Sequence, residues 1–173
     1  MQINVSQQLK EPIGSARTYD IDEVVEVLGE GVDVQGKVNL VRTDRGILAR
    51  GTIYTSVRVT CSRCLITCPC GLTLDIVEEY YPITDVLTGA PLPLPGEPGA
   101  FTIDEHHILD LTEAMRQYAV MAIPMKPLCR VSCAGLCPTC GHNLNDGPCG
   151  CPPQDTDPRW AVLRGLARPD DSP

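Results

Sequence analysis

Large aromatic side chains are scarce in this sequence of 173 residues, which contains one Phe and one Trp. A chain of this length forms one domain, or a modest domain with a small appendage. Hydrophobic residues make up 43% of the chain, which suits a globular protein, but few large aromatic side chains are available for its core. Metal sites would help such a chain, because metal binding adds folding free energy where hydrophobic burial is thin.

Long apolar runs are missing as well. No stretch approaches the roughly 18 apolar residues of a membrane span. The N-terminus, MQINVSQQLKEP, has neither the basic start nor the apolar run of a signal peptide. We therefore expect a cytoplasmic protein with no membrane partner. In that reducing compartment, cysteines at short spacing favour metal ligation over disulfides.

Positive charge is also in short supply, with 14 Lys and Arg against 22 Asp and Glu and a net charge of −8. Nucleic-acid affinity rests on neutralising phosphates, so the surface as a whole is not that of a nucleic-acid binder. Residues 126–173 are more balanced, with five basic against five acidic residues. Any RNA contact is therefore expected locally, near the cysteines, and a protein partner fits the charge at least as well.

Catalytic motifs are absent too. The sequence has no glycine-rich phosphate loop, no G-x-S-x-G and no Ser/His/Asp arrangement. His106 and His107 are adjacent in an acidic setting and are more often exposed residues than ligands. We therefore expect a protein that is not an enzyme and has no small-molecule substrate.

Cysteine, in contrast, is abundant. Six of the ten cysteines fall in Cys129–Cys151, and Cys137-Pro-Thr-Cys140-Gly141 has the form of a zinc knuckle, as in zinc-ribbon-like modules. A second Cys-x-x-Cys pair, Cys61 and Cys64, falls between two predicted strands. Both pairs are typical of structural zinc sites, in which two thiolates bind one ion from a tight turn.

Apolar periodicity predicts the secondary structure. Two-residue alternation indicates strands at the N-terminus (Ile3, Val5, Leu9) and over Val32–Leu40, Ile47–Thr60 and Leu72–Tyr81, with a hairpin turn at Thr43–Gly46 and a short strand at Phe101–Ile103. The stretch Tyr19–Leu28 mixes apolar and acidic residues and fits either a strand or a short helix, of which we favour the strand. Helical spacing of apolar residues indicates one clear helix, Ile108–Ile123, with Asp110 as N-cap and Glu113 three residues on.

These elements predict an α+β fold, in which an antiparallel β-sheet packs against one main helix and a small cysteine-rich, zinc-binding C-terminal module follows. The predicted domains are a sheet-and-helix core over 1–123, with a Pro/Gly-rich loop at 86–100, and a zinc module over 124–168 that ends in a short helix opened by Asp157-Pro158-Arg159-Trp160. Residues 169–173 are expected to be a disordered tail.

Several motifs occur in one order: Cys61-Ser-Arg-Cys64-Leu65, Leu109-Asp-Leu-Thr-Glu113, Ala122-Ile-Pro-Met-Lys-Pro-Leu-Cys129, Cys133-Ala-Gly-Leu-Cys-Pro-Thr-Cys-Gly141, Asn143-Leu-Asn145 and Asp157-Pro-Arg159. This succession resembles the YceD-type family, the large ribosomal RNA subunit accumulation proteins of bacteria and plastids. The resemblance implies a cytosolic, non-enzymatic factor of ribosome biogenesis that supports accumulation or processing of large-subunit rRNA. The implied partners are large-subunit precursor rRNA or a large-subunit ribosomal protein.

The family resemblance also bears on how the cysteines pair. Members that lack the Cys-Pro-x-Cys-Gly motif keep the Cys-x-Arg-Cys pair and ligand groups near positions 129 and 133, which implies that these two pairs belong together. Our hypothesis is two zinc ions, one held by Cys61, Cys64, Cys129 and Cys133 and the other by Cys137, Cys140, Cys149 and Cys151. One alternative joins Cys61, Cys64, Cys68 and Cys70 in one site and four of the last six cysteines in another. A further alternative has a single site.

Basic residues near the proposed sites are the candidates for RNA contact: Arg58, Arg63, Lys126, Arg130 and Arg159. The main alternative function is a thiol redox protein in which Cys61 and Cys64 exchange. Such motifs usually begin a helix, whose N-terminus lowers a thiol pKa, whereas this pair follows a strand. A catalytic zinc would need an open coordination position, which all-cysteine sites do not normally provide.

Overall fold

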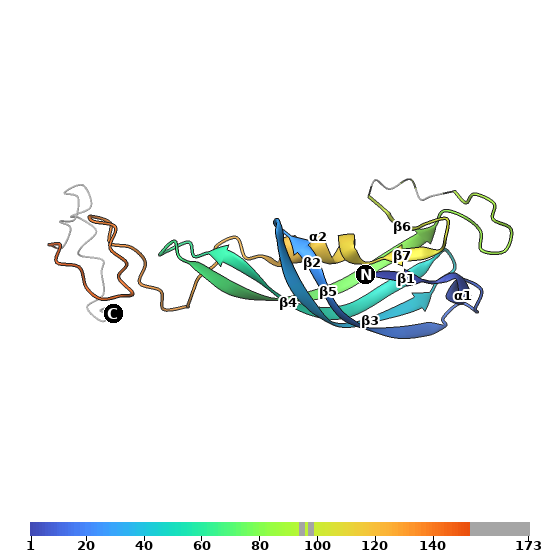
Figure 1. The fold of residues 1–173 in the computed structure, drawn as a ribbon, viewed down its shortest axis with the longest axis horizontal. Helices are drawn as coiled ribbons and strands as arrows, with labels where there is room; N and C mark the ends of the chain where they lie inside the picture. The colour runs from blue at the N-terminus through green and yellow to red at the C-terminus, as the bar shows by residue number, and fades with distance from the viewer. Residues whose placement is uncertain (94–95, 97–98, 153–173) are drawn as a thin grey trace, which may run out of the picture. The chain divides into compact units, whose positions relative to one another are not determined.

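The computed structural model describes residues 1–93, 96 and 99–152. Its strands are β1 (Gln2–Asn4), β2 (Ala16–Val27), β3 (Glu30–Arg42), β4 (Ile47–Thr60), β5 (Thr67–Pro82), β6 (Phe101–Ile103) and β7 (Ile108–Asp110), and its helices are α1 (Ser6–Leu9) and α2 (Thr112–Ala122) (Figure 1). The chain divides into two compact units. The first comprises Met1–Ser62 and Ile66–Cys129, and the second comprises Arg63–Leu65 and the residues from Arg130 onward.

The first unit is built on one mixed sheet in the order β1-β7-β6-β5-β4-β3-β2. Strands β2 to β5 pair antiparallel with their neighbours, whereas β5 and β6 are parallel. Helix α2 contacts both β5 and β2, although β4 and β3 lie between these strands. One helix reaches both because the sheet curls into a half-barrel, a curvature visible in Figure 1.

The long strands follow from alternating apolar residues, which point to one face of a pleated sheet. In β4, the side chains of Ile47, Ala49, Ile53, Val57 and Val59 are buried, whereas Arg50, Tyr54, Ser56 and Arg58 between them are exposed. Strands β3 and β5 alternate in the same way over most of their length. Burial of this face forms the core of the half-barrel.

Two glycines allow β3 and β4 to approach closely at the bend of the sheet. A Cβ atom on Gly36 would lie 2.8 Å from the Cα atom of Ile53, and one on Gly51 would lie 2.8 Å from the Cα atom of Val38, with a backbone carbonyl oxygen closer still in each case. Real Cβ atoms do not come this near, so these positions of the curved sheet exclude any side chain.

The predicted α+β class, with a sheet packed against one main helix, is wrong. The described chain is mostly β, with one seven-stranded mixed sheet and two short helices of 4 and 11 residues. The error has a physical cause. Three short strands, β1, β6 and β7, extend the sheet through pairings between distant residues, and three-residue strands are too short to show a periodic pattern.

Some of the predicted strands are confirmed, whereas the predicted start of the helix is wrong. The strands expected at Ile47–Thr60 and Phe101–Ile103 are confirmed as β4 and β6. The predicted helix from Ile108 begins only at Thr112, because Ile108–Asp110 forms strand β7. Leu111 takes the N-cap position predicted for Asp110, and the Asp110 carboxylate, at the end of β7, accepts a hydrogen bond from the Thr112 N–H at 2.9 Å.

Within the predicted Pro/Gly-rich loop, the described residues have local order. Thr84 bridges Pro91, and the Leu92 N–H donates to the carbonyl oxygen of Ile83 at 2.9 Å. The domain boundary at 123/124 stays a prediction. The short helix expected from Asp157 and the tail 169–173 lie outside the described residues.

Candidate metal centres

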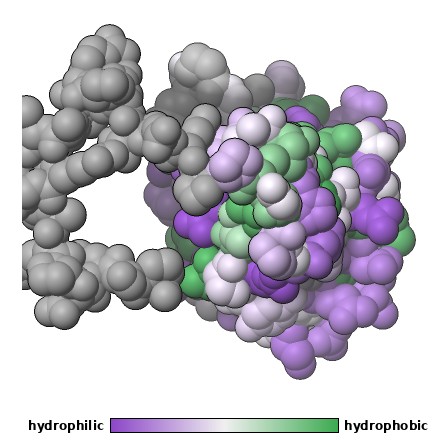
Figure 2. Space-filling model, turned by 90° about the vertical axis from the view of Figure 1, so that its left-hand side faces the viewer, coloured by the Kyte–Doolittle hydropathy of each residue, from purple (hydrophilic) through white to green (hydrophobic). Residues whose placement is uncertain are grey.

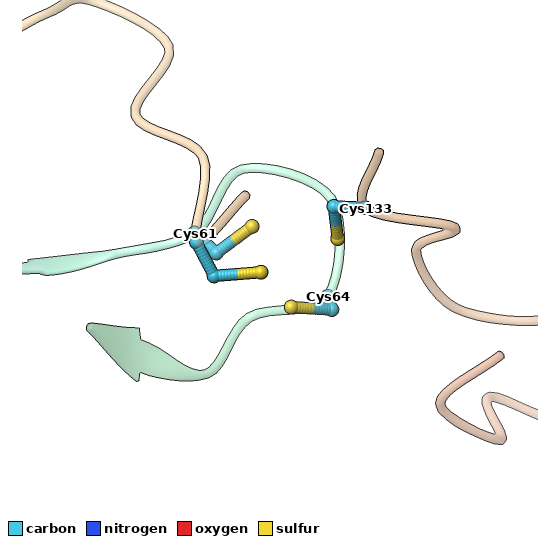
Figure 3. A group of neighbouring side chains, drawn as sticks. Cys61, Cys64 and Cys133 are labelled. Atoms are coloured by element: carbon cyan, nitrogen blue, oxygen red, sulfur yellow. The ribbon is translucent and has the colours of Figure 1, made fainter. Parts of the chain in front are cut away.

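The first cysteine cluster consists of Cys61, Cys64, Cys129 and Cys133, whose sulfur atoms all lie within 4.8 Å of one another. Three of the four residues are buried and Cys129 is half-buried. Figure 3 shows the sulfur atoms of Cys61, Cys64 and Cys133 facing a common space. A tetrahedral zinc ion with Zn–S bonds of about 2.3 Å places its ligand sulfurs about 3.8 Å apart, so this group has the spacing of a four-thiolate site.

Hydrogen bonds bring the first two segments of this cluster together. Cys61 follows the end of β4 directly, and its N–H donates to the carbonyl oxygen of Ile66 across the hairpin tip at 2.9 Å. Ser62 donates twice to the carbonyl oxygen of Pro127, from its N–H and from its hydroxyl, each at 2.8 Å. These contacts fix the hairpin tip against the segment that leads into Cys129.

The Cys133 segment is held by residues of the second unit. Arg63 donates from Nη1 to the Cys133 carbonyl oxygen at 2.9 Å. Asn145 donates from Nδ2 to the Cys133 sulfur at 3.4 Å, and its Oδ1 accepts from the Ala134 N–H at 3.0 Å. Gly135 has φ +78°, a left-handed conformation that favours glycine. Hydrogen bonds of this kind orient metal ligands and tune their basicity.

Asn145 is a residue whose role the sequence reasoning missed. In the sequence, Asn145 stands out only as the last residue of the motif Asn143-Leu-Asn145. A short polar residue between two cysteine pairs indicates a hydrogen bond near the sulfurs. It does not predict which sulfur the side-chain amide contacts.

The second cluster consists of Cys137, Cys140, Cys149 and Cys151, again with all four sulfur atoms within 4.8 Å. It lies within the second unit and is more exposed than the first, with Cys137 buried and Cys140 exposed. Gly141 has φ +73°, and its N–H donates to the Cys137 carbonyl oxygen at 2.9 Å. This tight turn has the form of the Cys-x-x-Cys-Gly knuckle that the sequence predicts.

The thiols of the second cluster have unequal acidities. The backbone N–H groups of Cys140 and Thr139, with the Cys149 thiol, lower the pKa of Cys137 to about 6. Hydrogen bonding with the Cys140 thiol raises the pKa of Cys151 to about 12.

The structure thus brings the eight predicted ligands together in the two groups of four that we paired. Cys68 and Cys70 lie on β5 opposite Val59 and Val57 and belong to neither group, so the described chain does not form the alternative site with Cys61 and Cys64. His106 and His107 also stand outside both groups. Each cluster has the donors for one metal ion.

The candidate RNA-contacting residues lie in different settings. Arg58, on β4, and Lys126, after α2, are exposed. Arg63 and Arg130 are exposed as well, but each also makes a local hydrogen bond, Arg63 to Cys133 and Arg130 to the Asn145 Oδ1 at 2.6 Å. Arg159 lies outside the described residues. On the face in Figure 2, hydrophobic and hydrophilic residues are intermixed, and no single kind covers it.

No helix in the described ranges is long and apolar enough to cross a membrane; the longer of the two, α2, has 11 residues.

Fold and clusters together define a mostly β protein with two candidate four-cysteine metal centres. A family model described as large ribosomal RNA subunit accumulation protein YceD matches residues 49–167. The chain therefore belongs to the YceD family, as its motifs suggested.

Individual relatives agree with this family. An uncharacterized protein of Mycobacterium tuberculosis is 28% identical over 166 residues, which cover 94% of this chain and 75% of the relative. An uncharacterized protein of Mycobacterium leprae is 30% identical over 166 residues, covering 94% of this chain and 71% of the relative. The Arabidopsis thaliana protein named large ribosomal RNA subunit accumulation protein YCED homolog 1, chloroplastic, is 23% identical over 184 residues, covering 94% and 56%. No solved structure matches the chain.

Proposed function

We propose that this protein is a non-enzymatic factor of ribosome biogenesis that supports accumulation of large-subunit rRNA. The observation that carries this proposal is the YceD family match over residues 49–167, a range that contains all ten cysteines. The name of the Arabidopsis relative supports it. The protein acts in the cytoplasm by binding large-subunit precursor rRNA or a large-subunit ribosomal protein.

Two structural zinc ions stabilise the protein in this proposal. Support comes from the donor chemistry, since four thiolates favour zinc among the common divalent ions of a cell. With four sulfur ligands, each ion has no open position for water or substrate, which agrees with a role in folding and not in catalysis. The first ion fixes the β4–β5 hairpin tip to the segment after α2, and the second closes the knuckle of the second unit.

Contact with the pre-ribosomal particle is assigned to exposed basic residues of the first unit, Arg58 and Lys126. Arg63 and Arg130 already donate to groups of their own unit, so their charges also serve the fold. Phosphate contacts draw on exposed cations, and these two residues supply them on a chain of net charge −8.

A thiol redox role for Cys61 and Cys64 is the competing function. Redox motifs of this spacing use a helix N-terminus to lower one thiol pKa. In this chain the pair occupies a turn between β4 and β5, with no helix after it. Alkylation distinguishes the two roles. Zinc-bound thiolates react slowly until a chelator is added, whereas an exchanging dithiol reacts rapidly in the presence of zinc.

Depletion of the protein in its own cells tests the proposed function. We expect the ratio of large- to small-subunit rRNA to fall and the tagged full-length chain to co-sediment with large-subunit precursor particles. The double variant Arg58→Glu/Lys126→Glu should lower this co-sedimentation, whereas Arg50→Glu, an exposed cation on β4, should leave it unchanged. An unchanged rRNA ratio, with the protein remaining at the top of the gradient, would refute the proposal.

A further inference from the structure

A cavity of about 550 Å³ lies in the first unit, and none of its lining residues belongs to either cysteine cluster. It forms where α1, the β3–β4 turn, the end of β5 and the segment after β5 meet. Its apolar walls include Leu9, Pro82, Val86 and Leu92. This volume falls within the roughly 300–1,000 Å³ of small-ligand pockets, which are mostly apolar with a few placed polar groups.

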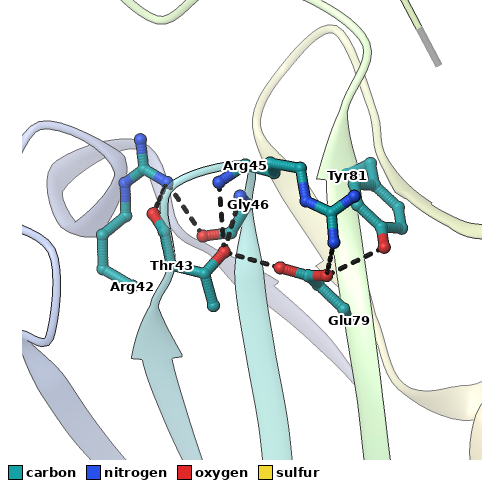
Figure 4. Close-up of polar contacts among 6 residues, drawn as sticks. All are labelled: Arg42, Thr43, Arg45, Gly46, Glu79 and Tyr81. Atoms are coloured by element: carbon teal, nitrogen blue, oxygen red, sulfur yellow. Dashed lines mark hydrogen bonds and ion pairs between the residues drawn. The ribbon is translucent and has the colours of Figure 1, made fainter. Parts of the chain in front are cut away.

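Two guanidinium groups line the cavity and are held in position. Arg42 donates from Nε to the Leu9 carbonyl oxygen at 3.2 Å and from Nη1 to the Gly46 carbonyl oxygen at 3.0 Å. Arg45 donates to Glu79 at 3.3 Å, and its guanidinium carbon lies 5.6 Å from the centroid of the Tyr81 ring (Figure 4). Each guanidinium keeps N–H groups outside these bonds, on Nη2 of Arg42 and on Nη1 of Arg45, and planar guanidinium donors match the oxygens of a phosphate.

An aromatic ring completes the lining, since Tyr81 is among the cavity residues and lies beside the Arg45 guanidinium. The hydroxyl oxygen of Thr84, another lining residue, is buried away from the cavity and makes no hydrogen bond within the described part of the chain.

Two carboxylates also line the cavity, Asp44 and Asp85. The Asp85 carboxylate accepts hydrogen bonds from the N–H groups of Thr88 and Leu87 at 2.8 and 3.0 Å, and these hold its pKa below the usual range. The Asp85 carboxylate is therefore charged, and it already accepts hydrogen bonds from the backbone of its own turn. With Glu79 paired to Arg45, negative charge here opposes a run of phosphates, so the two guanidinium groups can offset at most a single phosphate.

We propose that this cavity binds a single unpaired nucleotide of RNA. The base lies against the apolar walls, and its phosphate contacts Arg42 and Arg45. Proteins read single-stranded RNA through such splayed bases, beside aromatic and guanidinium groups. The inference rests on the proposed role in rRNA accumulation and adds a contact near the start of β4, whereas Arg58 lies near its end.

Fluorescence anisotropy of the zinc-loaded full-length protein with a labelled single-stranded uridine decamer tests the inference. Arg45 is the residue to change because its side chain is exposed, unlike Arg42, which holds the turn. Arg45→Glu should weaken binding by about tenfold or more, the loss of a charge-assisted contact. The matched control Arg50→Glu should bind as the wild type does, and uridine monophosphate should shift the NMR signals of Tyr81 and Thr84.

The inference is overturned if the wild type does not bind the decamer, if Arg45→Glu and Arg50→Glu weaken binding equally, or if duplex RNA binds as tightly. Loss of binding to a large-subunit ribosomal protein in Arg45→Glu, with RNA binding intact, would assign the cavity to a peptide and also overturn it. The depletion experiment separates this inference from the proposed function. A depleted strain with a normal rRNA ratio refutes the function, whereas normal decamer binding by Arg45→Glu refutes only the nucleotide site.

Discussion

The side-chain amide of Asn145 donates a hydrogen bond to the sulfur of Cys133, 12 residues earlier, at 3.4 Å. The same side chain accepts hydrogen bonds from the Ala134 N–H and from Arg130. A donor aimed at a thiolate stabilises its negative charge and fixes its direction, which is what a metal ligand requires. Asn145 therefore fixes the direction of the Cys133 sulfur and favours its thiolate form.

Replacing Asn145 should weaken the first cluster selectively. We expect Asn145→Ala to lower its zinc affinity by roughly 10- to 100-fold, the usual effect of losing such a partner. Competition with a chromophoric chelator measures this, in a Cys149→Ser/Cys151→Ser background that leaves only the first cluster. Asn39→Ala, at an exposed position on β3, is the control. Equal zinc affinity of Asn145→Ala and the control would contradict the assigned role.

Substitution by alanine should destabilise the fold strongly at one strand glycine and little at another. Gly51→Ala places a Cβ atom 2.8 Å from the Val38 Cα atom and should lower the free energy of unfolding by about 2 kcal/mol or more. Gly71→Ala, on β5, meets nothing within 4 Å and should change it by less than about 1 kcal/mol. Urea denaturation measures both. Equal destabilisation would contradict the close approach of β3 and β4.

The β3–β4 turn should make stability depend on pH through Glu79. The Thr43 hydroxyl donates to the Glu79 carboxylate at 2.7 Å and is the main cause that lowers the pKa of Glu79, with help from Tyr81 and Arg45 (Figure 4). Because the folded pKa lies below the unfolded one, Glu79 stabilises the fold above its unfolded pKa. That contribution is lost as the pH falls through the folded pKa.

Thr43→Val removes this donor and should flatten the decline of unfolding free energy between roughly pH 5 and pH 3. It should also lower stability at neutral pH, because the Gly46 N–H loses the hydroxyl that it donates to at 2.8 Å. Thr43→Ser keeps the hydroxyl and should follow the wild-type curve. Urea titrations across this range measure the slope, and a wild-type slope in Thr43→Val would exclude Glu79 as its source.

The long strands and the grouping of the cysteines could be predicted from the sequence. Alternation over 14 residues specifies β4 and places Cys61 directly after it. Short spacing within each pair, and the family pattern that links Cys61 and Cys64 to positions 129 and 133, led to the two groups that the structure brings together.

The fold class could not be predicted from the sequence, for a physical reason. Strand β7 pairs with β1 through Ile3 and Leu109, more than 100 residues apart, and β6 lies parallel to the end of β5 through Phe101 and Tyr80. Local periodicity carries no information about such partners. Ile108 and Leu109 also fit a helical stripe, so they were assigned to the helix that follows.

Metal content per chain tests the central claim most directly. Protein purified without added zinc, measured by mass spectrometry of the metal, should contain two zinc ions per chain. Cys61→Ser/Cys64→Ser and Cys149→Ser/Cys151→Ser should each retain one, and Cys68→Ser/Cys70→Ser should retain both, because these two cysteines lie outside both clusters. Two ions retained after Cys61→Ser/Cys64→Ser, or no zinc in the wild-type chain, would contradict the account.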